Sequence, residues 1–211
     1  VAAQAPLTGR RPPVIPITYA DVADLGRLVP NDAPHQGLVI EVEPLEDIWL
    51  GDLLEQGQGE DDRRPLVVLD QVTDPHNVGA ILRSAAAFDA LGIVTQDRHS
   101  PPESGAVART ASGALEIVPW VRVVNLSRAL GEIAEAGFWR VGLAGEATET
   151  LGNVIGAARI ALVLGAEGEG MRHNTMQHCD QLARLPISPR IESLNVSNAA
   201  AIALYAVAAR D

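Results

Sequence analysis

Apolar residues along this chain occur in short runs separated by polar turns, and the runs alternate between two kinds of spacing. Residues 66–70 and 160–164 are continuous apolar runs, the pattern of strands buried on both faces of a parallel sheet. Apolar residues three and four positions apart predict helices over residues 77–90, 126–136 and 195–209. Further strands are predicted at residues 37–43, 92–95, 117–124, 139–144 and 182–187. Further helices are predicted at residues 45–56 and 103–110, together with a short helix that Thr18 caps and that runs to Leu28. This alternation predicts an α/β fold with an open, mainly parallel sheet.

The chain is expected to have two parts, with the boundary in the polar, glycine-containing stretch of residues 57–64. Residues 1–17 hold four prolines, which exclude a regular helix and favour extended structure. The chain starts without a methionine, so we expect it to continue a longer protein. Ligands of open parallel sheets bind beyond the carboxyl ends of the strands, which directs attention to residues 70–83, 165–170 and 186–198.

Composition excludes several classes of protein. With 47% hydrophobic and 20% charged residues the chain is not of the disordered class. The single cysteine, Cys179, excludes a disulfide framework and a cysteine-rich zinc site, and it indicates a reducing compartment. All sixteen basic residues are arginine, which excludes a P-loop lysine and a Schiff-base lysine. No signal peptide or membrane span is visible, so we expect a cytoplasmic protein.

The net charge of −11 argues at first against a nucleic-acid-binding protein. Residues 41–62, however, hold nine acidic and no basic residues, which leaves only −2 for the rest of the chain. The acidity is therefore local, and it is typical of a solvated linker and an exposed helix face.

The first candidate site segment runs from Asp70, at the end of a predicted buried strand, to Arg83 on the following helix. Asn77 lies near the expected helix start, where its side chain can cap backbone groups. Gly79 lets another backbone or a ligand approach closely, and Arg83, four residues later, lies on the same helix face. An ordinary cap, a packing glycine and a surface arginine are the alternative interpretation. His76 is better explained as a turn residue than as a base.

The second segment places Gly165, Gly168 and Gly170 after a buried strand, where main-chain N–H groups can face a ligand. The spacing is neither that of a dinucleotide-binding motif nor that of a P-loop. Glu167 and Glu169 would repel a pyrophosphate, so a neutral or cationic ligand fits better. A glycine-rich turn without a ligand is the alternative.

The third segment gathers polar residues, Ser193, Asn195, Ser197 and Asn198, at the start of a helix that is apolar on all sides. Such a helix is buried all round, which implies a second subunit or a covering loop.

His173 and His178 are five residues apart and do not share a helix face, so no metal site is expected.

Together these segments resemble the SpoU family of the SPOUT class, AdoMet-dependent RNA ribose 2′-O-methyltransferases. The residues that carry the resemblance are Asn77-x-Gly79-x-x-x-Arg83, Gly165-x-Glu167-Gly168-x-Gly170, and Pro186 with Ser193-Leu-Asn-Val-Ser197. Residues 72–83 and 143–172 are most similar to the branch of the family that methylates a guanosine ribose of 23S rRNA. The resemblance implies a trefoil knot at the C-terminal side of the sheet and a homodimer formed through the knot region. It divides the chain into three parts. Residues 1–44 are expected to be part of a small L30e-like RNA-binding domain, whose first half would precede Val1. Residues 45–64 are expected to form an acidic helix and linker, and residues 65–211 the methyltransferase domain.

The resemblance also implies the cofactor, S-adenosylmethionine (AdoMet), and the residues of the site. The cofactor-binding residues are expected to be Gly145, Leu164, Gly165, Glu167, Gly168, Leu185, Pro186, Ile187, Ser193, Leu194 and Asn195. Arg83 is expected to activate the ribose hydroxyl, with Asn77, Glu167, Ser193 and Asn195 orienting it and the loops. The substrate is expected to be rRNA or, alternatively, tRNA, and no metal is needed. One departure is residues 188–191, a loop where many relatives have a glycine.

Two alternative functions, from other classes of protein, remain open. A catalytically silent RNA-binding protein on the same fold is disfavoured by the presence of Arg83, Asn77 and Asn195. A dinucleotide oxidoreductase is disfavoured because the G-x-G-x-x-G motif and its acidic ribose-binding residue are missing.

Overall fold

The computed structural model describes residues 15–29, 33, 35–59, 62–156 and 159–210, and the extended structure expected for residues 1–14 lies outside these ranges. The chain divides into two compact units, one up to Glu46 and one from Asp47 onward. The stretch of residues 57–64, where the sequence suggested a boundary, therefore lies within the second unit.

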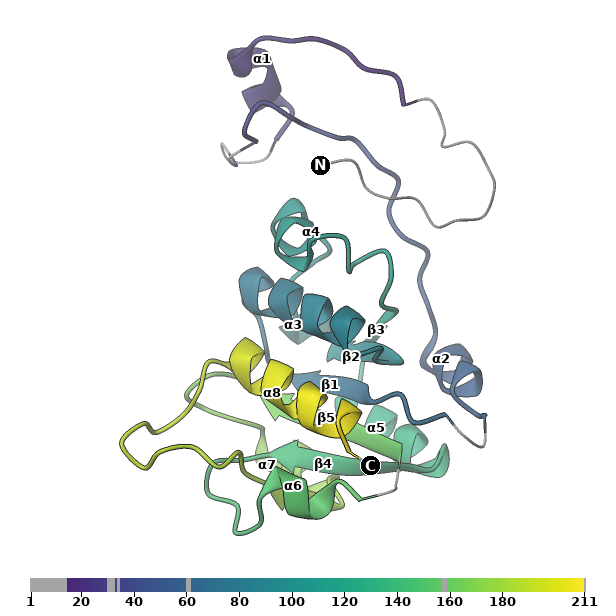
Figure 1. Cartoon of the computed structure of the whole chain (residues 1–211). Coiled ribbons are helices and arrows are strands. Elements are labelled where there is room, and N and C mark those ends of the chain that lie inside the picture. The colour runs from purple at the N-terminus through teal and green to yellow at the C-terminus, as the bar shows by residue number, and fades with distance from the viewer. Residues whose placement is uncertain (1–14, 30–32, 34, 60–61, 157–158, 211) are drawn as a thin grey trace. The chain divides into compact units, whose positions relative to one another are not determined.

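The larger unit is built on a sheet of six parallel strands in the order β3-β2-β1-β5-β4-β6 (Figure 1). The strands are β1 (Leu66–Asp70), β2 (Gly92–Gln96), β3 (Trp120–Val123), β4 (Phe138–Leu143), β5 (Arg159–Gly165) and β6 (Gln181–Ala183). The helices of this unit are α2 (Leu50–Gln56), α3 (Pro75–Ala87), α4 (Gly105–Ala111), α5 (Leu126–Glu135), α6 (Leu151–Val154), α7 (His173–Gln177) and α8 (Val196–Ala208), with a 3₁₀ turn, η2 (Asp97–His99), after β2. The α/β prediction with an open parallel sheet is confirmed.

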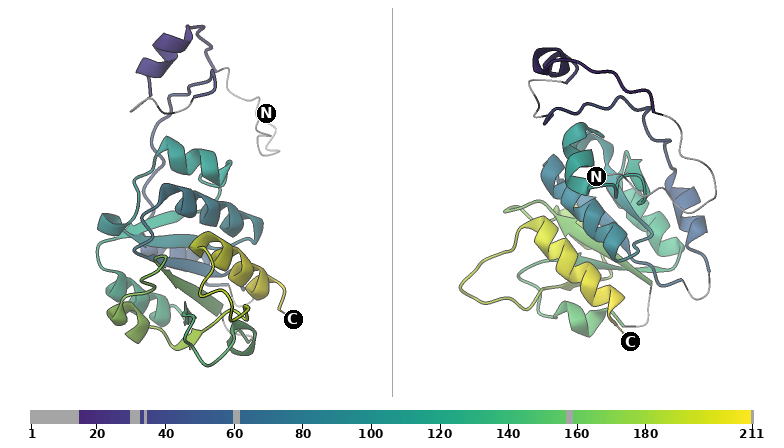
Figure 2. Two further views of the ribbon diagram at one scale, coloured as in Figure 1. Left: turned by 90° about the vertical axis from the view of Figure 1, so that its left-hand side faces the viewer. Right: turned by 45° about the horizontal axis from the view of Figure 1, so that its top comes forward.

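Helices cover both faces of the sheet, as the continuous apolar strands predict (Figure 2). Val67 and Leu69 of β1 join one core with α3, α4, α6 and α8, whereas Leu66 and Val68 join a second core with α2 and α5. The two cores are filled almost entirely by Ala, Val, Leu and Ile, as the low aromatic content requires.

The register of the two central strands determines where the loops emerge. Asp70, the last residue of β1, lies opposite Gly165, the last residue of β5. The loops that follow β1 and β5 therefore leave the sheet side by side at its carboxyl edge.

Most element boundaries agree with the predictions within a few residues, and the differences have local causes. Helix α3 begins at Pro75, two residues earlier than expected, because Asp74 and not Asn77 caps it by accepting from the His76 amide at 3.0 Å. Helix α2 begins only at Leu50, five residues later than expected.

Strand β6 ends at Ala183, so the strand predicted over residues 182–187 is wrong in its second half. The Arg184 amide donates to the carbonyl of Glu149 at 2.9 Å, and the Arg184 carbonyl accepts from the Leu151 amide at 2.9 Å. Arg184 is therefore paired with the loop before α6, and Pro186 then lacks the N–H that a ladder needs.

The smaller unit contains one short helix, α1 (Val22–Arg27), among its described residues. Asp21 caps this helix by accepting from the Asp24 amide at 2.7 Å, and Thr18, the expected cap, lies outside it. The strand predicted at residues 37–43 is wrong, because the described residues of this unit offer no second strand with which it could form a ladder.

No helix in the described parts of the chain is both long and apolar enough to cross a lipid bilayer.

Candidate ligand-binding site

A cavity of about 730 Å³ opens at the carboxyl edge of β4, β5 and β6. Its walls come from the three loops that follow β4, β5 and β6, from Met176 of α7 and from the start of α8. The lining residues are Leu143, Ala144, Gly145, Glu146, Leu164, Gly165, Ala166, Glu167, Gly168, Glu169, Gly170, Met171, Met176, Arg184, Leu185, Ile187, Ser188, Pro189, Ile191, Glu192, Ser193, Leu194, Val196 and Ala199. A volume of this size is in the range of small-molecule and cofactor sites.

The glycine loop after β5 doubles back tightly on itself. Ala166 and Gly170 exchange two backbone hydrogen bonds, of 3.1 and 2.9 Å. A Cβ on Gly165 would lie 2.0 Å from the carbonyl carbon of Gly170, so only glycine fits at that position. Gly168 and Gly170 adopt φ values of +80° and +69°, which disfavour other residues. The glycines of this motif therefore serve a compact backbone turn whose main chain borders the cavity.

Three side chains from the three sequence segments meet beside the cavity. The Glu167 carboxylate accepts from the side-chain amide of Asn77 at 3.1 Å, from that of Asn195, and from the Val196 amide at 3.3 Å. The Asn195 amide also donates to the side-chain oxygen of Asn77 at 3.0 Å. One oxygen of Glu167 thus joins α3, the glycine loop and the start of α8.

Asn195 has a second role as the N-cap of α8. Its side-chain oxygen accepts from the amides of Ser197 at 2.9 Å and Asn198 at 3.3 Å. The expected start of the last helix at this polar cluster is confirmed, and the cap directs the Asn195 amide group back towards Glu167.

Gly79 has a packing role, so the alternative interpretation of that residue is the correct one. A Cβ there would lie 2.7 Å from the Thr110 side chain and 2.8 Å from the Val107 carbonyl oxygen. The close approach at Gly79 is therefore that of α4.

Arg83 lies on α3 with its side chain exposed. Among the described residues it has no hydrogen-bond or ion-pair partner, and it does not line the cavity. It follows Asn77 by six residues, which is about 9 Å along a helix axis. Its guanidinium is thus exposed to solvent outside the cavity.

Most residues expected to bind the cofactor line the cavity. These are Gly145, Leu164, Gly165, Glu167, Gly168, Leu185, Ile187, Ser193 and Leu194. Pro186 and Asn195 do not border it, because Pro186 lies in the turn between two lining residues and Asn195 points to Glu167. Several lining residues were not foreseen, among them Met171, Met176 and Pro189, and their chemistry alone gave no signal.

The cavity is acidic. Four carboxylates line it, those of Glu146, Glu167, Glu169 and Glu192, against one guanidinium, that of Arg184. This balance agrees with the expectation of a neutral or cationic ligand. Apolar side chains such as Leu164, Leu185 and Leu194 share the lining and can cover a planar ring.

The histidines near the site are held within α7. The His178 ring lies 2.8 Å from the carbonyl of Asn174, and that of His173 lies 2.9 Å from the Gln177 side-chain nitrogen. In the described ranges no group of three or more His, Cys, Asp and Glu side chains could hold a metal ion.

Comparison with known proteins places the chain among RNA methylases. Residues 64–205 match the SpoU rRNA Methylase family. An uncharacterized tRNA/rRNA methyltransferase from Synechocystis is 41% identical over 192 residues, which are 90% of this chain and 50% of that protein. The 23S rRNA (guanosine-2′-O-)-methyltransferase RlmB from Pseudomonas aeruginosa is 40% identical over 194 residues, 92% of this chain and 77% of that protein.

A solved structure gives the same picture. The AdoMet-bound rRNA methyltransferase from Sinorhizobium meliloti has a TM-score of 0.66 and 27% sequence identity, and the match covers 74% of this chain and 59% of that one. The chain spans half to about three-quarters of the length of these relatives.

Proposed function

This chain belongs to the SpoU rRNA methylase family, and we propose that it transfers a methyl group from AdoMet to a ribose 2′-hydroxyl of rRNA, on a guanosine of 23S rRNA. The observation that carries the proposal is the meeting of Asn77, Glu167 and Asn195 beside an acidic cavity at the carboxyl edge of the sheet. The three segments are far apart in sequence, and a packing role alone does not require polar side chains at this junction.

The residues of the cavity fit AdoMet. Bound AdoMet supplies a methyl group on a positively charged sulfonium. The carboxylates of Glu146, Glu169 and Glu192 favour a cation in the cavity. The main chain after β5 and β6 can hydrogen-bond a nucleoside, while Leu185 and Ile187 exclude water from it.

Arg83 acts on the hydroxyl by electrostatics. A guanidinium has a pKa above about 12, so it is a poor general base. Its charge can hold the RNA phosphate and stabilise the negative charge that develops on the attacking 2′-oxygen. Asn77 is held through Glu167 and Asn195, and it fixes the start of the helix that carries Arg83. Ser193 borders the cavity and orients the last loop.

We infer the rest of the architecture from the family. We propose a trefoil knot in the segments after β5 and β6, which is supported by the backbone bonds of Arg184 to Glu149 and Leu151 near the loop that follows β4. We propose that residues 1–44 belong to an L30e-like RNA-binding domain, and that the acidic residues 45–64 follow it as a connection whose helix α2 packs into the methyltransferase unit. The protein acts as a homodimer in the cytoplasm.

Two other substrates or roles are the alternatives. The relative from Synechocystis is named for tRNA as well as rRNA, so a tRNA ribose is the second candidate. A protein without catalysis that only binds RNA would show no methyl transfer to any RNA.

Replacing Arg83 by Ala tests the proposal. We expect methyl transfer to rRNA to fall by at least about 100-fold while the AdoMet Kd stays within a few-fold, because Arg83 does not line the cavity. Transfer of labelled methyl groups and calorimetry measure the two quantities. The matched control is Arg128→Ala on α5, whose guanidinium is exposed and pairs with Glu132 in its own helix. Near-normal turnover by the Arg83 variant, or tight binding of NADH in place of AdoMet by the parent protein, contradicts the proposal.

A further inference from the structure

The carboxylate of Asp70 is fully buried at the end of β1, and its charged partner comes from a distant part of the chain. One oxygen accepts from the Arg172 main-chain amide at 2.9 Å, and the other accepts from Arg172 Nε at 2.8 Å. The Nη2 atom of Arg172 lies 2.6 Å from the same oxygen that Nε reaches. A buried carboxylate needs such a partner, because the cost of leaving the charge unpaired is large.

The position of this ion pair relates it to the cavity. Asp70 lies opposite Gly165 in the β1–β5 ladder, and Gly165 begins the glycine loop. Arg172 directly follows Met171, the last residue of the loop, which also lines the cavity. The Asp70 carboxylate therefore binds Arg172, at the end of the glycine loop, while Asp70 itself pairs in the sheet with Gly165, at the start of that loop.

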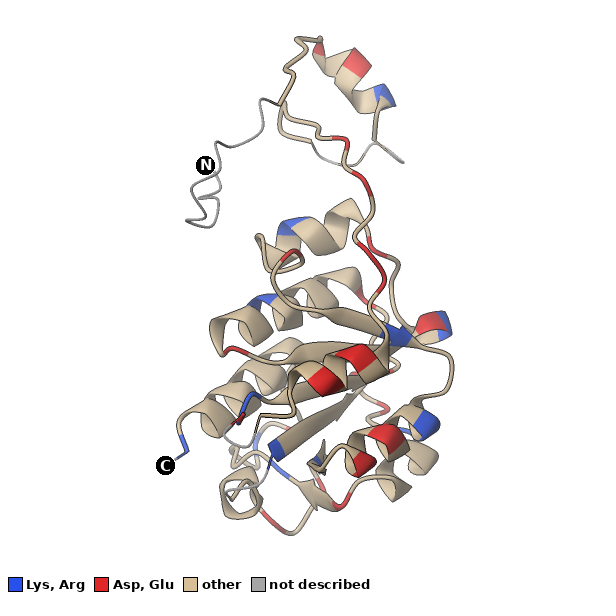
Figure 3. Ribbon diagram, turned by 90° about the vertical axis from the view of Figure 1, so that its right-hand side faces the viewer, with Lys and Arg blue, Asp and Glu red and all other residues tan. Residues whose placement is uncertain are grey.

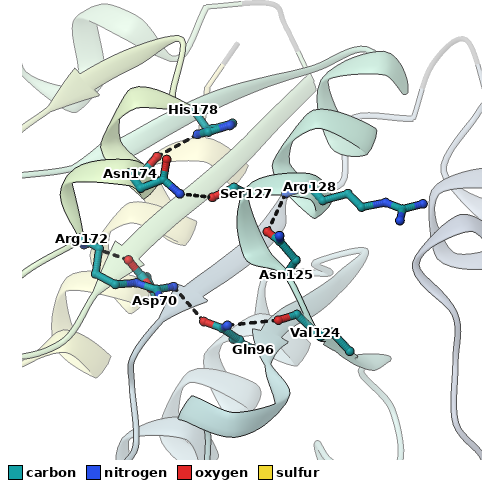
Figure 4. Close-up of polar contacts among 9 residues, drawn as sticks. All are labelled: Asp70, Gln96, Val124, Asn125, Ser127, Arg128, Arg172, Asn174 and His178. Atoms are coloured by element: carbon teal, nitrogen blue, oxygen red, sulfur yellow. Dashed lines mark hydrogen bonds and ion pairs between the residues drawn. The ribbon is translucent and has the colours of Figure 1, made fainter.

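A second interaction extends the connection across the sheet (Figure 4). Arg172 Nη2 donates to the side-chain oxygen of Gln96 at 2.8 Å, and the Gln96 amide donates to the Val124 carbonyl at 3.1 Å. The loop exit is thus fixed to the ends of β1 and β2 and to the residue after β3.

We propose that the Asp70–Arg172 ion pair holds the glycine loop in the geometry that binds AdoMet, which makes Arg172 a positioning residue of the site. The loop has few other ties. Within it, Ala166 and Gly170 bond to each other, the Glu167 side chain bonds to α3 and the start of α8, and the Met171 side chain packs into the core beside β4. Loosening its exit leaves the loop free to depart from the turn that borders the cavity, without touching Arg83. The inference rests on the proposed function for the identity of the ligand.

The test compares Arg172→Met with a matched change at the opposite end of β5. Arg159 begins that strand and stacks on the Phe138 ring, with its guanidinium on the carbonyls of Ala136 and Gly57, so Arg159→Met also removes a partly buried guanidinium. For Arg172→Met we expect the AdoMet Kd and KM to rise at least about tenfold while kcat at saturating AdoMet stays within about threefold. For Arg159→Met we expect a lower Tm with an unchanged Kd. Arg172→Lys keeps the charge but not the fork of donors, and we expect a smaller rise in Kd.

A second readout uses the ligand-free protein. Amide hydrogen exchange of residues 166–171 is expected to speed up about tenfold or more in Arg172→Met, to a lesser degree in Arg172→Lys, and not in Arg159→Met. Kd and loop exchange within twofold of the parent protein in both Arg172 variants would overturn the inference, as would equal effects of Arg159→Met. If Arg172→Met fails to fold, Arg172→Lys decides by the same criteria. If the parent protein binds no AdoMet, the proposed function fails, whereas loop exchange still decides whether the ion pair holds the loop.

Discussion

At the scale of single residues, Gly165 is the position where one added carbon atom has the largest effect on the site. A Cβ there would meet backbone atoms at 2.0 Å on Gly170 and 2.1 Å on Met171, and backbone cannot rotate aside. Gly165→Ala is therefore expected to lower the Tm by several degrees and to raise the AdoMet Kd at least about tenfold.

The matched control is Gly131→Ala in the middle of α5, where a Cβ meets nothing within 4 Å. This change is expected to raise the free energy of unfolding by up to about 1 kcal/mol. Thermal unfolding and calorimetry check both variants. Unchanged AdoMet affinity in Gly165→Ala would show that the tight turn is irrelevant to binding.

Cys179 offers a second residue-scale test, through its ionisation. Burial raises the pKa of its thiol to about 12, although the guanidinium of Arg140 opposes this effect. Because the thiolate is the reactive form, the folded protein is expected to react with a disulfide reagent at pH 8 at least about 100-fold more slowly than the urea-unfolded chain.

The same pKa gives a sign for the pH dependence of stability. The thiol ionises from about pH 9.0 in the unfolded chain but stays protonated in the folded one, so its contribution to stability is complete below pH 9 and is lost between pH 9 and about 12. Comparing the parent with Cys179→Ala across this range isolates the effect. Rapid labelling of the folded protein would contradict a raised pKa of this half-buried thiol.

At the scale of elements, α2 belongs to the methyltransferase unit although in sequence it lies within the acidic residues 41–62; Figure 3 colours acidic residues red. Leu50, Leu53 and Leu54 are buried in the core that α5 covers. Leu53 also packs directly on Gly92 of β2, where an added Cβ would lie 2.8 Å from the Leu53 side chain. Leu53→Ala is expected to lower the free energy of unfolding by about 2–5 kcal/mol.

Urea unfolding measures this change, and Leu45→Ala is its control. Leu45 is 43% exposed and precedes α2, so its truncation is expected to cost less than about 0.5 kcal/mol. Equal effects of the two substitutions would mean that α2 is only a linker.

The elements that the sequence predicted well are those whose apolar pattern decides their environment. Strands β1 and β5, with every residue or nearly every residue buried, were visible as continuous apolar runs. Residues 37–43 also have a strand-like local pattern, a short apolar run followed by Glu41 and Glu43, but no partner among the described residues, and pairing is not encoded locally. Strand β6 stopped early for a similar reason, since Arg184 pairs with a loop 34 residues before it.

In the site, too, the sequence indicated the residue types but not the partners that the fold gives them. Motifs indicated that Asn77, Glu167 and Asn195 matter, but not that they bond to one another. The role of Asp70 was invisible, because an acid at the end of a strand gives no sign of a partner 102 residues later. Gly79 was left open between a backbone and a ligand as the close neighbour, since spacing does not distinguish the two, and the structure shows the backbone of α4 there.

At the scale of the whole molecule, the surface of α8 supports the proposed homodimer. One side of α8 is buried by α3 and the sheet, yet Ile202 is 46% and Tyr205 60% exposed on another. We expect a light-scattering mass of twice 22.3 kDa at low micromolar concentration, and dissociation on Ile202→Asp.

Val124→Asp is the control for placing an acid on an exposed apolar position, because Val124 is 84% exposed and lies beyond β3. It is expected to leave the mass unchanged. A monomeric mass for the parent chain, or dissociation by both substitutions, would contradict an interface at α8.

The order of the strands also determines when the molecule can become complete during synthesis. Strand β1 has one edge covered by β2, but its other edge waits for β5, which leaves the ribosome about 95 residues later. The bond between Asn77 and Asn195 spans 118 residues, so the site closes only when nearly all of this sequence has been translated. Parallel pairing over such separations is slow, and the open edge of β1 is exposed to other chains in the meantime. We therefore expect the same topology that brings the three motifs together to leave the nascent chain prone to aggregation until α8 has been synthesised.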